Sequence, residues 1–244
     1  MTTRTTMLGM SEDHPSRSIL ILLALLLLLG FFAFAIVGFA GLLLINGVSV
    51  SALISGLLAM TDKTAWHLSR SAGTVAYLLL SGSTVWGLLQ SSKLAKEVIP
   101  AGLSYAMHNI LSWLALIFTG LHALVLLFDN YYTYTLSDLT IPFIGPYRPI
   151  WVGLGIIGFY LMLMVIISFQ VRTRIGQQRW RALHYFSFVV YALATVHGLA
   201  AGTDSSKLSM RLMYLGSGLL VFFLTNYRLL MRDMSASRSV RNRH

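Results

Sequence analysis

The 244-residue sequence contains no cysteine and few charged residues. Without cysteine the chain has no disulfide and no thiolate ligand for haem or an iron–sulfur cluster, so histidine, methionine and carboxylates remain as internal metal ligands. Charged residues make up 11% of the chain, whereas soluble domains carry about 25%. Hydrophobic residues make up 56%, and the mean hydropathy is +0.73. This composition indicates an integral membrane protein.

Six apolar segments are long enough to cross a bilayer, which takes about 20 helical residues. They lie at residues 19–45, 68–90, 101–128, 150–171, 180–201 and 210–231. The first run is about twice the length of a signal-peptide core, so we expect a retained helix. The sequence therefore predicts an all-α integral membrane protein with a six-transmembrane-helix bundle over 19–231. An N-terminal tail (1–18) and a basic tail (232–244) flank the bundle.

Basic residues collect on one side of this predicted bundle. The side that holds both termini and the second and fourth connections has 13 of the 18 lysines and arginines; the other side has Lys63, Arg70, Arg148, Lys207 and Arg211. Positive residues favour the cytoplasmic side, so we expect both termini in the cytoplasm and the protein in the plasma (cytoplasmic) membrane. The net charge of +10 then reflects topology and contact with membrane lipid. Nucleic-acid binding is not expected.

Four histidines lie within the third and fifth predicted spans. His108 and His122 are 14 residues apart, and His184 and His197 are 13 apart. At about 1.5 Å per residue these separations are roughly 20 Å, so each helix carries one imidazole in each half of the membrane. Both spans run outward, so His108 and His184 share the inner depth, and His122 and His197 the outer. A buried imidazole needs a partner, and two imidazoles at one haem iron suit electron transfer.

The 13-residue spacing has a geometric consequence. At about 100° per residue, 14 residues return to within about 40° of the starting direction, whereas 13 residues miss it by about 140°. Either the fifth helix is distorted between His184 and His197, or the two centres approach it from different sides.

Three short stretches accompany the histidines: SRSAG at 69–73, WRALH at 180–184 and HGLAAGTD at 197–204. With them, residues 60–232 resemble the ferric reductase-like transmembrane domain. Ferric reductases, NADPH oxidases and the membrane haem subunit of the periplasmic methionine-sulfoxide reductase system share this domain. The resemblance implies two b-type haems between helices three and five, an inner one on His108 and His184 and an outer one on His122 and His197. It also implies electron transfer from a cytosolic or membrane donor to an exterior acceptor, such as ferric iron, oxygen, a quinone or a partner reductase.

The larger members of that family carry a flavin- and NADPH-binding dehydrogenase after this domain, whereas about a dozen residues follow position 231 here. The GxGxxG string at 153–158 lies in an apolar span without the strand-turn-helix context of a dinucleotide site, so it indicates close helix packing. We therefore expect an oxidoreductase component that receives electrons from a separate flavoprotein or quinol.

Further candidate residues surround the predicted haems. Arg70 lies at the depth of the outer haem and would bind a propionate or snorkel to the interface; Arg148 is a second propionate candidate. His67 is expected at the interface, with a ligand or proton-donor role as the alternative. Residues 136–143 form either a short surface helix or a plain connection that Pro142 stops. The cytoplasmic connection at 172–181 would bind a flavin, a flavoprotein or a quinone, or is the positive-inside signal alone.

Two alternatives remain open at this point. A haem-free transporter or channel would use the histidines to relay protons or metal ions, but it favours carboxylates at midplane depth, of which the sequence has few. A one-haem protein would leave the other histidines to a flavin or quinone site.

Overall fold

The computed structural model describes residues 62–91, 99–129 and 131–241. The predicted N-terminal tail and first span, 1–18 and 19–45, lie outside these ranges. Every regular element within them is a helix, and none is a strand. Five segments are long and apolar enough to cross a membrane: 64–91, 101–128, 149–170, 177–201 and 208–231. Their bounds agree to within four residues with predicted spans two to six, because hydropathy and length alone determine where a chain can enter lipid.

The elements follow one another as a series of long helices with short connections. They are α3 (Asp62–Ser91), α4 (Ala101–Leu124) with its 3₁₀ extension η1 (Val125–Phe128), α5 (Leu136–Thr140), α6 (Pro149–Gln170), α7 (Arg172–Ile175), α8 (Gln177–His184), α9 (Phe186–Ala201) and α10 (Leu208–Arg241). Pro149 opens α6, where its missing N–H costs no helical hydrogen bond. Gly176, with φ of +86°, makes the turn from α7 to α8.

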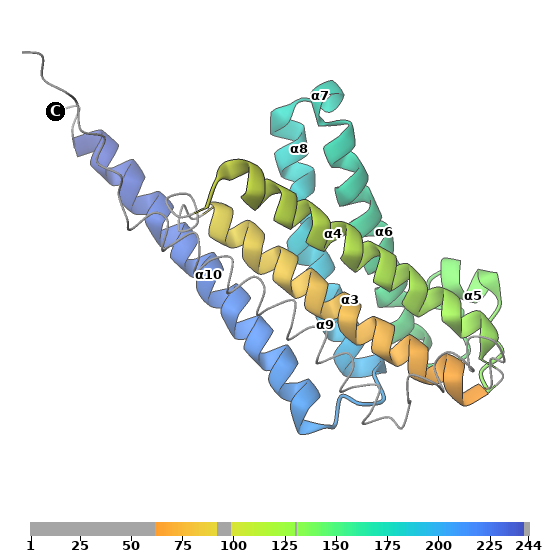
Figure 1. Cartoon of the computed structure of the whole chain (residues 1–244). Helices are drawn as coiled ribbons and strands as arrows, with labels where there is room; N and C mark the ends of the chain where they lie inside the picture. Colours follow the sequence, from red (N-terminus) through yellow and green to blue (C-terminus); the bar gives the residue numbers. More distant parts are fainter. Residues whose placement is uncertain (1–61, 92–98, 130, 242–244) are drawn as a thin grey trace, which may run out of the picture.

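The helices pack as two pairs. Helix α3 lies along α4 and α6 lies along α9, while α10 packs on α3 (Figure 1). Four of these helices share one buried core, with Leu79 from α3, Ala115 from α4, Met162 from α6 and Val190 from α9. Ala115 is fully buried, so its small side chain allows close helix approach. The pairing brings α4, which carries His108 and His122, opposite the α8–α9 segment, which carries His184 and His197.

The fifth span is broken immediately after His184. Helix α8 ends there, α9 begins at Phe186, and the intervening Tyr185 N–H is 3.3 Å from the carbonyls of both Arg181 and Ala182. The Phe188 N–H then bonds the Tyr185 carbonyl at 3.1 Å, a tightened three-residue turn. The helix therefore has the distortion that was one of the two alternatives for the 13-residue histidine spacing.

The predicted surface segment at 136–143 contains a helix of five residues, α5. Its capping box joins Thr135 and Asp138, and these hydrogen bonds to the carboxylate lower the pKa of Asp138 below its usual value. Tyr160 of α6 donates a 2.6 Å hydrogen bond to the Thr140 carbonyl. Phe143, with φ of +72°, lies against Gly153 of α6. The segment thus folds onto the N-terminal half of α6.

Candidate functional site

The histidines meet in two pairs of nearly identical geometry. The ring centres of His108 and His184 are 6.0 Å apart, and those of His122 and His197 are 6.1 Å apart. The angle between ring planes is 73° in both pairs. The residues predicted to act together therefore lie together, one pair toward each end of α4.

Three of the four rings are held by a backbone carbonyl at Nδ1. The distance is 3.1 Å from His108 to the Ser83 carbonyl, 2.7 Å from His122 to the Ser69 carbonyl, and 2.9 Å from His197 to the Trp151 carbonyl. A carbonyl only accepts, so Nδ1 carries the proton in each ring and Nε2 keeps its lone pair. This arrangement is typical of metal-ligating histidines, whose second nitrogen donates to a fixed acceptor.

Two serines of α3 reinforce these contacts. The Ser69 hydroxyl donates to the His122 carbonyl at 2.9 Å and lies 3.1 Å from its Nδ1. The Ser83 hydroxyl lies 3.3 Å from His108 Nδ1 and 2.8 Å from the Ser112 hydroxyl. Ser69 and Ser83 are 3% and 5% exposed. They are 14 residues apart on α3, the same spacing as that of the two α4 histidines they contact.

Glycines face the same three rings. A Cβ added at Gly73 would lie 2.8 Å from His122 Nδ1, one at Gly155 would lie 2.7 Å from His197 Nδ1, and one at Gly87 would lie 3.2 Å from His108 Cε1. Real Cβ atoms essentially never approach as closely as at Gly73 and Gly155, and the contact at Gly87 is tighter than most, so glycine lets α3 and α6 lie close against the rings. Gly155 belongs to the GxGxxG string, whose predicted packing role thus has a specific contact.

The inner pair opens into a cavity of about 610 Å³. This volume is within the range of cofactor and ligand sites. His108 and His184 line it with apolar residues of α3, α6 and α9 and with two cations, Arg181 of α8 and Arg228 of α10. The Trp180 ring stacks on His184 with centres 5.3 Å apart.

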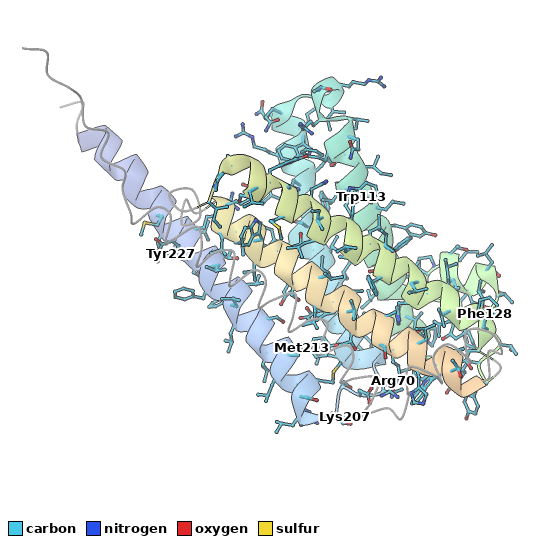
Figure 2. The ribbon with its side chains drawn as sticks, viewed as in Figure 1. Arg70, Trp113, Phe128, Lys207, Met213 and Tyr227 are labelled. Atoms are coloured by element: carbon cyan, nitrogen blue, oxygen red, sulfur yellow. The ribbon has the colours of Figure 1, made fainter. Side chains whose placement is uncertain are left out.

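The outer arginines have protein partners. Arg70 forms an ion pair with Asp204, which also pairs with Lys207 at 2.9 Å, and the Arg70 guanidinium lies 4.0 Å from the centre of the Trp66 ring. In Figure 2 Arg70 and Lys207 lie at the same end of the bundle, away from Tyr227. Arg148 donates to the Ala200 carbonyl at the end of α9. A propionate-binding role for either arginine stays a prediction.

Other predicted residues lie apart from the pairs. The His67 ring contacts Trp66 edge-on at 4.9 Å near the start of α3. In the basic connection at 172–181, the Arg172 guanidinium lies 3.7 Å from the centre of the Phe169 ring and donates to the Phe169 carbonyl at 3.1 Å. From this connection, Gln177, Trp180 and Arg181 line the inner cavity, and Arg181 is the arginine among them.

A buried hydroxyl cluster was not predicted. The Tyr77 hydroxyl of α3 lies 3.3 Å from that of Tyr191, 3.2 Å from that of Thr195 and 2.8 Å from that of Ser217. Tyr77 and Tyr191 are 5% and 7% exposed. The cluster joins α3, α9 and α10 in the membrane interior. Its sequence signal was tyrosine in apolar spans, which is also common at interfaces and therefore unspecific.

Comparisons with protein-family models, with curated proteins and with solved structures find no match to this chain. Within the described ranges, no three histidine, aspartate or glutamate side chains converge on one point. That part of the chain therefore has no metal site built from three protein ligands, and the paired histidines are its candidate site.

Proposed function

We propose that the protein is a membrane cytochrome of the ferric reductase-like kind, which holds two b-type haems and passes single electrons across the bilayer. The observation that carries this proposal is the repetition of one histidine arrangement at two depths, with ring separations of 6.0 and 6.1 Å. Buried imidazoles in lipid are costly without partners. Two matched pairs on facing helices favour the same kind of bound partner at both depths.

The separation suits a metal ion between two imidazoles. Two nitrogen–metal bonds of about 2.0–2.1 Å, with about 1.1 Å from each nitrogen to its ring centre, span about 6.3 Å. A direct hydrogen bond of about 2.9 Å between two ring nitrogens would bring the centres to about 5.1 Å. The observed separations are closer to the first value, so His108 with His184, and His122 with His197, would fit a cofactor whose iron is held by two imidazoles.

The residues of this chain would hold the haems, and they orient the histidine rings. The carbonyls of Ser69, Ser83 and Trp151 fix three rings with Nε2 free to bind. The apolar helices lower the local dielectric around both pairs, which would tune the redox potential of a bound haem. When bound, each haem supplies an iron that alternates between ferrous and ferric states.

The proposed direction of transfer is from the cytoplasm outward. Arg181 at the inner cavity and the neighbouring basic connection suit an anionic donor, such as a flavin phosphate or an acidic flavoprotein surface; a quinol is the membrane alternative. The acceptor would be ferric iron, oxygen, a quinone or a partner reductase. We propose a plasma-membrane location with both termini in the cytoplasm, and a role as one component of a redox system.

Haem counting tests the proposal. We expect the detergent-purified protein to contain two b-type haems per chain by reduced-minus-oxidised spectra and the pyridine haemochrome assay. His108→Ala and His122→Ala should each lose one haem, while His67→Ala, the control, keeps both. Absence of haem after expression with ample haem supply would contradict the proposal and favour the haem-free transporter. One haem, lost in only one of the two variants, would favour the one-haem alternative.

Electron transfer across the membrane is tested separately in vesicles. Proteoliposomes with ferricyanide trapped inside and a membrane-impermeant reductant outside should reduce the ferricyanide only when the protein holds both haems. The His108→Ala and His122→Ala proteins should both fail, because either break interrupts the path. Equal rates in these variants and in the intact protein would contradict transfer through both centres.

A further inference from the structure

The two histidine pairs differ in how firmly their members are held. His122 and His197, the outer pair, each donate Nδ1–H to a carbonyl and each lie against a glycine of a neighbouring helix. In the inner pair His108 has the same two contacts. The His184 ring has neither: within the described residues it forms no hydrogen bond, and no glycine there faces it.

Apart from the facing His108 ring of α4, the ring that contacts His184 belongs to its own helix. Trp180, whose ring stacks on His184, lies one turn earlier on the same helix, α8. The Trp180 Nε1 atom is buried without a hydrogen-bond partner. Its ring meets Phe169 of α6 edge-on at 5.9 Å, a contact that links α8 to the rest of the bundle without directional bonding.

Helix α8 itself is weakly fixed. None of its eight residues is buried, and it is separated from α9 by the break at Tyr185, where the amide is shared between two carbonyls at 3.3 Å. Segments with few buried contacts are the ones that open at low free-energy cost. His184 is the last residue of this arm, beside a cavity of about 610 Å³ into which its ring can turn.

We propose that the inner centre exchanges His184 for a small external Lewis base, whereas the outer centre stays closed. The inference rests on the proposed function, since it needs a metal between His108 and His184. The exchange breaks the bond from the His184 nitrogen to iron and forms one bond from the incoming ligand; no electron is transferred, and iron keeps its oxidation state. Arg181 and Arg228 beside the cavity favour neutral or anionic ligands over cationic ones.

The expected difference in ligand affinity between the two centres follows from the hydrogen bond that His184 lacks. Loss of the acceptor that orients a metal-bound histidine lowers metal affinity by about 10- to 100-fold. We therefore expect an external ligand to bind the inner centre at least 10-fold more tightly than the outer one.

Carbon monoxide is the probe for the reduced protein. After haem counting has established two haems per chain, CO is titrated into the dithionite-reduced, detergent-purified full chain and the Soret band is followed. About half of the haem should bind CO. In His122→Ala, which keeps the inner centre, nearly all remaining haem should bind; in His108→Ala, which keeps the outer centre, little should. Cyanide added to the oxidised protein should give the same selectivity.

A tryptophan pair tests the role of α8. Trp180→Leu removes the contact with Phe169 and should speed CO binding at the inner centre; Trp113→Leu, on the exposed side of α4, is the matched control and should not. Equal CO binding at both centres, at neither, or only at the outer one would overturn this inference alone. Fewer than two haems, found before CO is added, would overturn the proposed function as well.

Discussion

The imidazole rings of His122 and His197 lie 6.1 Å apart, although the residues are 75 positions apart in the chain, and each ring lies against a glycine on its other side. Gly73 of α3 faces His122, and Gly155 of α6 faces His197. The outer pair is therefore enclosed between two helices that approach through glycine. An added side chain at either glycine would therefore collide with a histidine ring of the site, although glycine itself has no functional group.

Alanine at Gly155 should displace His197. The added Cβ would lie 2.7 Å from its Nδ1, so either the ring or α6 must shift, at a cost of about 1–3 kcal/mol for overpacking. We expect total haem to fall toward one per chain, with a smaller effect for Gly87→Ala, where the closest atom is 3.2 Å away. Gly120→Ala, with open space around it, is the control and should keep both haems. Unchanged haem content in Gly155→Ala would refute the steric argument.

Residues 147–151 position the end of α9. The Tyr147 hydroxyl bonds the Ala201 carbonyl at 3.1 Å, and Arg148 bonds that of Ala200, just beyond His197. Tyr147→Phe and Arg148→Gln each remove about 1 kcal/mol of hydrogen bonding. The midpoint potential of the proposed outer haem should shift by on the order of 20–40 mV, since a tenfold change in a one-electron equilibrium constant corresponds to about 59 mV.

Spectroelectrochemical titration separates the two haems in these variants. The potential of the proposed inner haem should stay constant, and Arg174→Gln in the basic connection at 172–181 should shift neither potential. A shift confined to the inner haem would show that this segment does not act on His197.

The Arg70–Asp204 ion pair should stabilise the outer end of the bundle. Both side chains are about 15% exposed (15% and 14%), and loss of one partner in a buried pair costs roughly 3–5 kcal/mol. We expect Asp204→Asn to lower the free energy of unfolding by about 3 kcal/mol, near the bottom of that range because some exposure remains. Lys207→Gln, which alters a pair whose lysine is 47% exposed, should cost less than about 1 kcal/mol.

A double variant isolates the pair itself. Arg70→Gln with Asp204→Asn should be more stable than the two single losses added together, because neither Arg70 nor Asp204 is then left as an unpaired, largely buried charge. Denaturation in detergent with increasing SDS measures all four proteins. Additive losses would show that the two side chains do not interact in solution.

The sequence predicted the parts of this structure that depend on distance along one chain segment. Hydropathy located the five described spans, and the helical rise placed His108 level with His184. It did not predict which groups hold the rings, because the carbonyls of Ser69 and Trp151 come to their histidines only through packing of different helices. The backbone offers a carbonyl at every residue, so no letter of the sequence marks the ones that are used.

Partners of charged side chains were also beyond sequence reasoning. Arg70 was expected near one end of its helix, but its partner Asp204 lies 134 positions later in the chain, in a turn whose approach depends on α9 and α10. The break at Tyr185 was foreseen only as one of two solutions to the 13-residue spacing. The helical period of about 3.6 residues indicates that His184 and His197 would point in different directions on a straight helix. It does not indicate whether, or at which residue, the helix is distorted.

Removal of the Tyr77 hydroxyl should loosen the contact of α3 with α9 and α10. Its oxygen lies within 3.3 Å of three other hydroxyls, and hydrogen bonds between membrane helices contribute about 0.6–1.7 kcal/mol. We expect Tyr77→Phe to lower the unfolding free energy by about 1 kcal/mol. Tyr131→Phe, with a side chain 80% exposed, is the control and should have no measurable effect. A similar loss in both variants would rule out a specific role for the cluster.

Alkaline pH should destabilise the outer connection through Tyr134. Burial, with a smaller contribution from the Asp129 carboxylate, raises the pKa of Tyr134 to about 12. The unfolded phenol ionises near pH 10, so the folded state keeps its proton where the unfolded state releases it. Stability is then fully present below about pH 10 and is lost as pH rises toward 12. Thermal unfolding between pH 9 and 12, compared for the intact protein and Tyr134→Phe, measures this loss. The variant should lose less stability over that interval, because its ring has no proton to release; parallel curves would assign the alkaline loss to other groups.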